Sequence, residues 1–207
     1  MTVFLVDDDN SVRKALARLI RAAGYEIKAF ASAQEFIESM PETAGVACLV
    51  LDVRMPGFNG LDLQNAMRAA NMPIPIIFIT GHGDIPMSVR AMKAGAVDFL
   101  AKPVQSKVLL RAIDQALARA ALESKDLAET KQLQACFDSL TRREQEVMAL
   151  VVTGLLNKQV AHELGTVEKT VKVHRARVMA KMGAASVADL VRFGEKLGLP
   201  PKKSQPI

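Results

Sequence analysis

The sequence feature that most limits the fold is a regular alternation of short β-rich runs with longer amphipathic stretches. The runs are TVFLV, EIKAF, VACLVL, PIIFI and VDFLA, and apolar residues with helical spacing follow each of them. Repeated βα units of this kind form a parallel sheet covered by helices. VACLVL and PIIFI are apolar throughout, as expected of strands that are buried on both faces. We therefore predict a doubly wound α/β domain that ends near Ala121.

Carboxylates follow two of these predicted strands. Asp7, Asp8 and Asp9 come directly after the first run, and Asp52 comes after the third. Because two like charges about 4 Å apart repel by roughly 4 kcal/mol at an effective dielectric constant of about 20, such a cluster requires solvent or a cation. Functional residues of open α/β sheets gather at the carboxyl ends of the strands, where a group of carboxylates suits Mg²⁺. A solvated helix start is the alternative, and we assign it to Asp9.

Two further strand ends add a hydroxyl group and an ammonium group. Thr80 lies in FITGHGD and Lys102 lies in FLAKP. Beside a carboxylate and a metal ion, these two groups would neutralise a phosphoryl group carried on the carboxylate. His82 of the same loop is interpreted as an ordinary loop histidine. The sequence thus points to phosphoryl chemistry at one edge of the sheet.

A long uninterrupted stretch follows the α/β pattern, with no Gly or Pro between Gln105 and Phe137. Its apolar stripe is formed by Leu109, Ile113, Ala116 and Ala120. The stretch then turns polar in ESKDLAETKQLQ. This pattern predicts a fifth helix that continues as a linker helix, and a break near Glu123 is the alternative.

The rest of the chain has an all-helical pattern. Thr141 with Glu144 predicts a capping box, Asn157 is expected to cap NKQVAHEL, and Gly165 turns the chain. The basic stretch VEKTVKVHRARVMAKM follows, and a final helix is expected from about Ser186. Two short helices around a Gly turn, the second of them basic, indicate a helix-turn-helix.

The net charge of +5 is unevenly distributed. Residues 1–122 carry +1, and residues 123–207 carry +4. Between Val167 and Met182, five basic residues accompany Glu168 alone. Nucleic-acid-binding proteins show such clusters, and a solvated helix face is an equally good account of the charge by itself.

No apolar run is long enough to cross a bilayer, since runs such as IPIIFIT are far too short. No signal peptide pattern opens the chain. Cys48 and Cys136 fit reduced core thiols better than a disulfide framework. We therefore expect a cytoplasmic protein with no membrane association.

Several motifs together resemble a known family. The DD pair after the first run, LDVRMPGFNG, ITGHGD and KAGAVDFLAKP resemble the receiver domain of bacterial two-component response regulators. The tail from LTRREQEVMALVVTGLLNKQVAHELG to KTVKVHRARVMAKMGA resembles the DNA-binding domain of the FixJ/NarL branch. The resemblance implies a flavodoxin-like receiver at 1–121, a linker helix at 122–137 and a small all-α helix-turn-helix domain at 138–207.

The same resemblance implies roles for the acidic residues. Asp52 would be the phosphoacceptor. Asp8, Asp52 and the backbone carbonyl of Arg54 would bind Mg²⁺, and Asp7 would act largely through a coordinated water.

The switch residues are implied in the same way. Lys102 would pair with the phosphoryl oxygens, and Thr80 would move to donate a hydrogen bond to one of them. Phe99 occupies the place of the family's switch aromatic, which is often Tyr. Pro103 resembles the proline of the family's cis Lys-Pro bond, although the sequence alone does not show that isomer.

The helix expected from about Val167 has two faces. A core-facing stripe is formed by Val171, His174, Val178 and Met182. By resemblance, the positions of Lys172, Val173 and Ala176 approach base edges, on a face that also carries Lys169, and phosphate contacts are expected from Arg175, Arg177 and Lys181. The family usually has Ser or Thr where this chain has Val167, so either Thr166 caps a shifted helix or the cap is absent.

These features predict a transcriptional response regulator rather than an enzyme. Its partners would be a sensor histidine kinase, promoter DNA, a second copy of the chain after phosphorylation and, as a further candidate, RNA polymerase. The family often dimerises through a region that corresponds to Asp84 to Gln115. A metal-dependent phosphohydrolase with Asp52 as nucleophile is one rival, and a DNA-binding protein that acts without phosphorylation is another.

Overall fold

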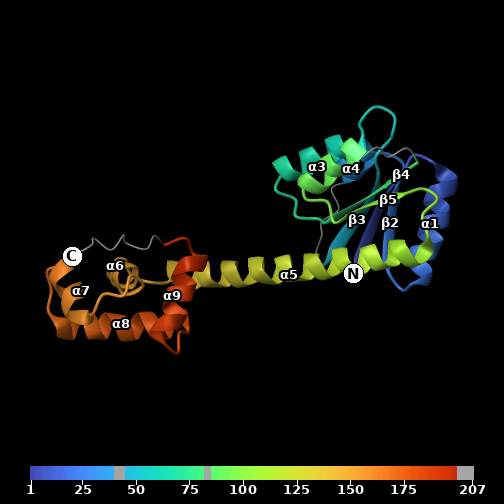
Figure 1. The fold of residues 1–207 in the computed structure, drawn as a ribbon. Helices are drawn as coiled ribbons and strands as arrows, with labels where there is room; N and C mark the ends of the chain where they lie inside the picture. The colour runs from blue at the N-terminus through green and yellow to red at the C-terminus, as the bar shows by residue number, and fades with distance from the viewer. Residues whose placement is uncertain (40–44, 82–84, 200–207) are drawn as a thin grey trace. The chain divides into compact units, whose positions relative to one another are not determined.

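The computed structural model describes residues 1–39, 45–81 and 85–199 (Figure 1). His82 lies outside the described residues. The chain divides into two compact units, Met1–Lys125 and Asp126–Ile207. Within the described residues, no helix is long and apolar enough to cross a membrane.

The first unit contains a five-stranded parallel sheet. Its strands are β1 (Thr2–Val6), β2 (Glu26–Phe30), β3 (Ala47–Asp52), β4 (Ile76–Thr80) and β5 (Asp98–Ala101). Their spatial order is β2-β1-β3-β4-β5, the flavodoxin-like order of doubly wound domains. The predicted fold class is confirmed, and β1 and β3 are neighbours. Their carboxyl ends therefore lie side by side.

Helices cover both faces of this sheet. They are α1 (Asn10–Ala22), α2 (Ala33–Ser39), α3 (Gly60–Ala69), α4 (Ile85–Lys93) and α5 (Ser106–Asp138). One face packs against α1 and α5, and the other packs against α2, α3 and α4. All six residues of β3 are buried, as the continuous apolar run predicts for a strand covered on both faces.

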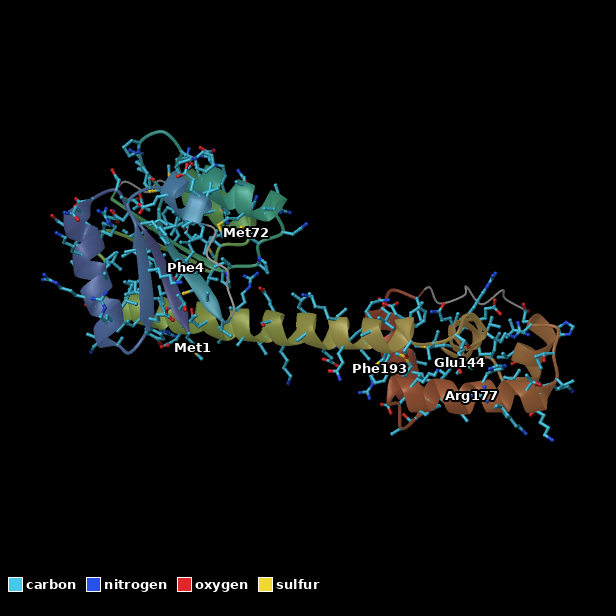
Figure 2. The ribbon with its side chains drawn as sticks, turned by 180° about the vertical axis from the view of Figure 1, so that it is seen from behind. Met1, Phe4, Met72, Glu144, Arg177 and Phe193 are labelled. Carbon is cyan, nitrogen blue, oxygen red and sulfur yellow. The ribbon has the colours of Figure 1, made fainter. Side chains whose placement is uncertain are left out.

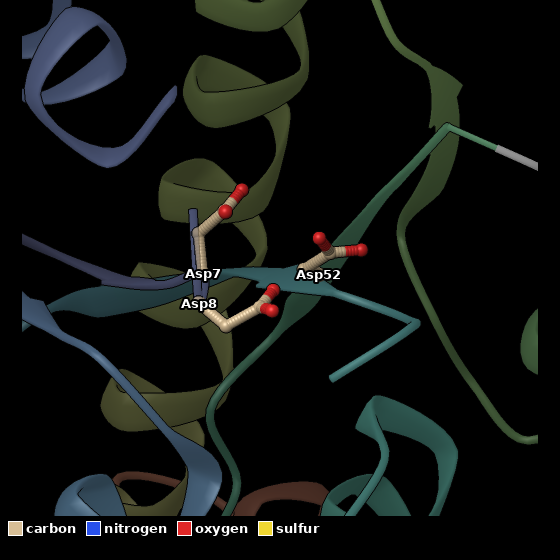
Figure 3. A group of neighbouring side chains, drawn as sticks. All are labelled: Asp7, Asp8 and Asp52. Carbon is tan, nitrogen blue, oxygen red and sulfur yellow. The ribbon is translucent and has the colours of Figure 1, made fainter. Parts of the chain in front are cut away.

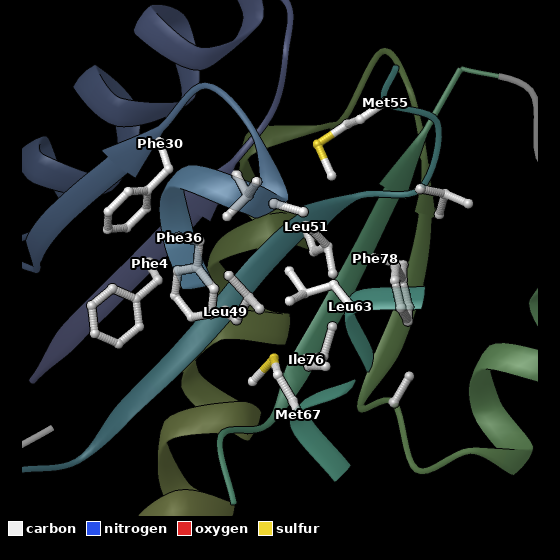
Figure 4. Packing of buried hydrophobic residues seen from close by; sticks show 14 of the residues in the cluster. Phe4, Phe30, Phe36, Leu49, Leu51, Met55, Leu63, Met67, Ile76 and Phe78 are labelled. Atoms are coloured by element: carbon white, nitrogen blue, oxygen red, sulfur yellow. The ribbon is translucent and has the colours of Figure 1, made fainter. Parts of the chain in front are cut away.

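Figure 4 shows the core beneath α2, α3 and α4. Phe36 of α2 contacts Phe4 and Phe30 edge to face, with ring centroids 5.6 and 5.4 Å apart. Each fully buried aromatic or aliphatic side chain of this kind stabilises the fold by about 1.5–3 kcal/mol. This packing holds the strands rigidly, and it fixes the positions of the side chains that follow them.

The helix α5 continues without a break from Ser106 to Asp138, over 33 residues. The predicted continuous helix is therefore observed, and the alternative break near Glu123 is not. Near its start, Asp114 accepts a hydrogen bond from the hydroxyl group of Tyr25. That bond raises the pKa of Tyr25 to about 12, with a smaller contribution from burial. The peptide bond between Lys102 and Pro103 is cis.

The second unit is helical. It contains α6 (Arg142–Val151), α7 (Asn157–Glu163), α8 (Glu168–Met182) and α9 (Val187–Lys196). Val171, Val178 and Met182 of α8 are buried in its core, as predicted. His174 is half-buried, and its Nδ1 atom is buried with no hydrogen-bond partner among the described residues. Leu133, near the end of α5, belongs to the same core, so this core begins before residue 138.

The helix ends test several predictions about caps. The capping box of Thr141 and Glu144 is confirmed. The last helix begins where it was expected, at Val187, and Ser186 is its N-cap residue. The prediction that Asn157 caps the next helix is wrong. The N-cap of α7 is Leu156, whose backbone N–H donates to Oε1 of Gln159 at 2.8 Å. Leucine has no side-chain acceptor, so only this half of a capping box exists.

The start of α8 settles the two alternatives for its cap. The N-cap residue is Val167, and no side-chain hydrogen bond caps the helix. The backbone N–H of Thr166 instead donates to the carbonyl oxygen of Ala161, at 2.9 Å. The cap that Ser or Thr would supply is therefore absent. Such a cap is typically worth about 0.5–2 kcal/mol.

Candidate metal centre and nucleic-acid interface

Three carboxylates meet at the carboxyl ends of β1 and β3 (Figure 3). One oxygen atom from each of Asp7, Asp8 and Asp52 lies within 4.8 Å of the others. Asp7 and Asp52 are buried and Asp8 is exposed. The parallel register of the two neighbouring strands produces this convergence, because Val6 pairs with Leu51 immediately before the acidic residues.

The loop after β1 is held by its own backbone and by Arg13. The carboxylate of Asp7 accepts the N–H of Asp9 at 3.0 Å. Asp9 caps α1 by accepting from the amides of Ser11 and Val12, and these bonds lower the pKa of Asp9. The guanidinium of Arg13 donates to the carbonyl oxygen of Asp7 at 2.5 Å. Sequence reasoning missed Arg13, although its position four residues after the predicted helix start at Asp9 was a usable signal.

Lys102 provides the positive charge of the cluster. Its Nζ atom lies 2.5 Å from Oδ2 of Asp52 and 2.8 Å from Oδ2 of Asp7. The buried Oδ2 of Asp7 is thus paired with the ammonium of Lys102 and has no other hydrogen-bond partner among the described residues. An oxygen of that kind, with two more carboxylates beside it, fits the donor set of a hard dication such as Mg²⁺.

The pKa values follow from burial and pairing. Burial raises the pKa of Asp7, and Lys102 opposes this shift without cancelling it. Burial alone would lower the pKa of Lys102, but its hydrogen bond to Asp52 and its pairing with Asp7 outweigh that effect, so the pKa is raised. Lys102 is therefore held as a cation between two carboxylates.

The remaining predicted residues of this site come from β4 and β5. Thr80 ends β4 and is fully buried, and its carbonyl oxygen accepts the N–H of Lys102 at 2.7 Å. Phe99 on β5 is half-buried, and its ring centroid lies 6.2 Å from that of Phe78. The backbone N–H of Arg54 donates to Oδ1 of Asp52 at 3.1 Å. The structure thus brings Arg54, Thr80 and Lys102 to the end of the sheet where the carboxylates lie, whereas Phe99 lies further back along β5, beside Phe78.

The turn between β3 and α3 approaches the site closely. The N–H of Gly60 donates to the carbonyl oxygen of Val53 at 3.0 Å. A Cβ atom at Gly60 would lie 2.4 Å from the carbonyl oxygen of Asp52. Glycine is therefore required at this position because the backbone of Asp52 occupies the space of a side chain.

The helix α8 presents the other predicted site. Most of its predicted contact residues are exposed, namely Lys169, Lys172, Val173, Ala176, Arg177 and Lys181, and Arg175 is half-buried. Within this set, Nζ of Lys172 lies 3.2 Å from Oε1 of Glu168. Because this ion pair is exposed, a phosphate can take the place of Glu168 at little cost in free energy. Figure 2 places Arg177 on this helix. The exposed face is thus basic with two small apolar positions.

Two of the predicted phosphate contacts have partners inside their own unit. Nη1 of Arg175 donates to Oδ1 of Asn157 at 2.8 Å, which ties α8 to the start of α7. Nζ of Lys181 lies 2.7 Å from Oε2 of Glu144. The side chain of Glu144 is only 2% exposed. Sequence reasoning recognised Glu144 as a cap but missed this pairing.

The pairing of Glu144 predicts a pH dependence of stability. The hydrogen bond from Lys181, followed by that from the N–H of Thr141, lowers the pKa of Glu144 from 4.5 to about 2. A carboxyl group whose pKa is lower in the folded than in the unfolded protein stabilises the fold fully at pH values above its unfolded-state pKa. This stabilisation is lost as the pH falls through the folded-state pKa. We expect the unfolding free energy of the second unit to fall between pH 4.5 and about 2 more steeply in the wild type than in Glu144→Gln.

Denaturant titrations followed through the amide NMR signals of α8 measure this difference. Glu146 and Asp189 also have lowered pKa values, and they titrate in both proteins, so the comparison isolates Glu144. Parallel curves for the two proteins would contradict the assignment.

Comparison with known proteins identifies a family for each of the two parts of the chain. Residues 3–114 match the response regulator receiver domain, and residues 138–193 match the luxR family of bacterial regulatory proteins. Nodulation protein W of Bradyrhizobium diazoefficiens is 53% identical over 198 residues, which cover 95% of this chain and 86% of that protein. The transcriptional regulatory protein FixJ of Rhizobium meliloti is 42% identical over 200 residues, which cover 97% and 98%.

Solved structures give the same result. The response regulator StyR matches with a TM-score of 0.81 and 51% identity over 94% of this chain and 98% of that one. Full-length FixJ from B. japonicum matches with a TM-score of 0.57 and 40% identity over 96% and 98%. The chain therefore belongs to the two-component response regulators of the FixJ type, transcription regulators in which a receiver domain precedes a LuxR-type DNA-binding domain.

Proposed function

We propose that Asp52 is the phosphoacceptor of this regulator and that a sensor histidine kinase supplies the phosphoryl group. A carboxylate oxygen of Asp52 attacks the phosphorus atom, and the bond from phosphorus to the histidine nitrogen breaks. The observation that carries this proposal is the position of Lys102, whose Nζ lies 2.5 Å from Asp52 within a cluster of three carboxylates. Lys102 can exchange its carboxylate partner for a phosphoryl oxygen as charge accumulates there.

The residues that would hold Mg²⁺ are Asp8, Asp52 and the carbonyl of Arg54, with Asp7 acting through a water. When bound, the ion supplies positive charge that offsets the repulsion between the carboxylates and an incoming phosphoryl group. The grouping of one oxygen atom from each of Asp7, Asp8 and Asp52 within 4.8 Å of one another supports this assignment.

The buried Thr80 and the half-buried Phe99 are proposed as switch residues. Thr80 would donate its hydroxyl to a phosphoryl oxygen, and Phe99 would repack against Phe78 as β4 and its loop adjust. Phe99 lacks the hydroxyl of the usual tyrosine, so its part in the switch would be packing alone.

The proposed DNA contacts come from α8. Lys172, Val173 and Ala176 would approach base edges, where Lys donates to guanine and the small apolar side chains contact a thymine methyl. Arg175, Arg177 and Lys181 are the expected phosphate contacts, which supply affinity without sequence choice, and Lys169 lies on the same face as the base-reading positions. A regulator bound to a promoter would in turn act on RNA polymerase.

We propose domain bounds of 1–121 for the receiver, 122–137 for the linker helix and 138–207 for the DNA-binding domain. Leu133, Cys136 and Phe137 pack with the core of the second unit. The last turns of the linker therefore support the fold of the DNA-binding domain.

A metal-dependent phosphohydrolase is the rival enzyme. The family is generally composed of transcription regulators rather than enzymes. A cavity of about 570 Å³ lies between α3 and α4, but none of the three clustered carboxylates lines it. It therefore offers no substrate site over Asp52.

Phosphorylation is proposed to produce a homodimer through α4. Three apolar side chains spaced by four and three residues lie exposed on one face of this helix, namely Ile85 (80%), Val89 (43%) and Met92 (45%). Such a stripe at helical spacing is typical of a surface that packs against another chain. Two copies would bring two DNA-binding domains onto paired half-sites.

We expect acetyl phosphate with Mg²⁺ to convert the wild-type chain from monomer to dimer and to raise its affinity for promoter DNA. Val89→Glu should stay monomeric at the same protein concentration while it is phosphorylated to the same extent, because a charge then lies within the stripe. Light scattering gives the molar mass, and intact-mass spectrometry gives the extent of phosphorylation. Leu122→Glu is the control, since Leu122 is 67% exposed outside the stripe. Dimers of phosphorylated Val89→Glu would contradict the assigned surface.

A further inference from the structure

The last turn of α8 is tied to the start of α6. Nζ of Lys181 lies 2.7 Å from Oε2 of Glu144 and 3.2 Å from the carbonyl oxygen of Ser139. Glu144 is 37 residues away in sequence and Ser139 is 42 residues away. One ammonium group therefore joins three elements of the second unit, which are the turn after α5, the first turn of α6 and the end of α8.

Glu144 has two tasks in this contact. It completes the capping box of α6 by accepting the N–H of Thr141 at 2.9 Å, and it pairs with Lys181. Its side chain is 2% exposed, and that of Lys181 is 37% exposed. A buried carboxylate that loses its only cationic partner is left uncompensated. The ammonium of Lys181 is thus held against Glu144, and the buried carboxylate of Glu144 requires this positive charge.

This geometry differs from that of the other basic residues of α8. Lys169 and Arg177 are exposed and have no ion-pair partner among the described residues. Their charge is available to a phosphate at no cost to the fold. Moving Lys181 to a phosphate would break its bonds to Glu144 and Ser139, so a phosphate contact would have to replace both.

Ser139 connects this contact to the linker. The helix α5 ends at Asp138, and Ser139 follows in the turn that leads to α6. A change in the direction of the end of α5 therefore acts on the carbonyl that Lys181 holds, and through Lys181 on the end of α8.

We propose that Lys181 is a positioning residue for the recognition helix, which acts through Glu144 and Ser139 and makes no phosphate contact. The proposal rests on the DNA-binding role proposed above for α8. It replaces the phosphate role that the family resemblance suggests for this one residue, and it makes the Lys181–Glu144 pair the point where the linker helix meets the recognition helix.

The Glu144→Gln variant separates the two accounts. Glutamine at this position keeps the capping box but removes the charge that holds Lys181. If Lys181 contacted phosphate, this variant would free the ammonium and strengthen binding to any DNA. If Lys181 positions α8, Glu144→Gln must weaken specific binding, as Lys181→Met should.

The experiment compares full-length phosphorylated wild type, Lys181→Met, Glu144→Gln, the double variant and Arg177→Met. The probes are a duplex selected by the wild type from a randomised pool and a random-sequence duplex, titrated at several salt concentrations. We expect each single variant at the pair to lower the ratio of specific to random affinity about five- to tenfold, and the double variant to lower it no further. In plots of the logarithm of the binding constant against the logarithm of the salt concentration, the variants at the pair should have the same slope as the wild type. Arg177→Met should reduce the magnitude of that slope by about one.

Tighter binding of Glu144→Gln to random DNA, together with a reduced slope for Lys181→Met, would overturn the proposal. Additive losses in the double variant would do the same. Hydrogen exchange of the free proteins gives a second readout, in which the amides of the last turn of α8 and of residues 139–144 should exchange faster in Lys181→Met but not in Arg177→Met. If the wild type selected no sequence from the pool, the DNA-binding role proposed for α8 would fail. Unchanged hydrogen exchange in Lys181→Met would separately refute the positioning role of Lys181.

Discussion

An Asp52→Asn variant is expected to gain no phosphoryl group from acetyl phosphate, whereas the wild-type chain gains one in the presence of Mg²⁺. The asparagine side chain would keep the shape of the aspartate but would lack a nucleophilic carboxylate oxygen and the charge that pairs with Lys102. Intact-mass spectrometry measures the outcome directly. Chelation of the dication should suppress the reaction of the wild type, because Lys102 alone would then offset the repulsion between the three carboxylates and the incoming group.

Asp9→Asn is the matched control for this experiment. Asp9 lies beside the cluster in sequence but caps α1, and Asn is an equally good N-cap residue. This variant should be phosphorylated as the wild type is. Equal phosphorylation of Asp52→Asn and the wild type would refute the assignment of the phosphoacceptor.

The Gly60→Ala variant is expected to lose both stability and phosphorylation. Its new Cβ atom would meet the carbonyl oxygen of Asp52 at 2.4 Å, against a backbone atom that has little freedom to move. Overpacking of this kind typically costs about 1–3 kcal/mol. Relief of the clash must displace either α3 or the end of β3, and the second displacement moves Asp52 away from Lys102.

Thermal unfolding and the rate of phosphorylation by acetyl phosphate measure the two effects of Gly60→Ala. The control is Gly45→Ala, because a Cβ atom at Gly45 meets nothing within 4 Å. The interpretation would be wrong if Gly60→Ala matched Gly45→Ala in both measurements.

The receiver could be predicted in detail because its signals are local and its topology follows a general rule. Apolar runs located the strands to within one residue or so, and the neighbouring positions of β1 and β3 then brought Asp7 and Asp52 together. The capping box of Thr141 and Glu144 was equally accessible, since both partners lie within four residues of each other. In each of these cases the physical cause is contained in a short segment.

The wrong or missing predictions in the second unit concern contacts between residues that lie far apart in sequence. Asn157 is a good cap residue by local preference, yet its side chain accepts from Arg175, which lies 18 residues further along the chain. The partner of Lys181 is 37 residues away. A helical phase assigned from sequence shows which face a side chain occupies, but it does not show whether an acidic residue of another helix lies beneath that face.

The bond between Tyr25 and Asp114 gives the protein an optical property. The chain has one tyrosine and no tryptophan, so a single phenol ring produces its tyrosine fluorescence. A carboxylate that accepts the phenolic proton quenches that fluorescence in the excited state. Since Asp114 belongs to α5 and Tyr25 precedes β2, we expect the native emission to be dim while α5 packs on the sheet and to brighten if the helix separates from it. The regulator thus carries an intrinsic fluorophore at the root of its linker helix.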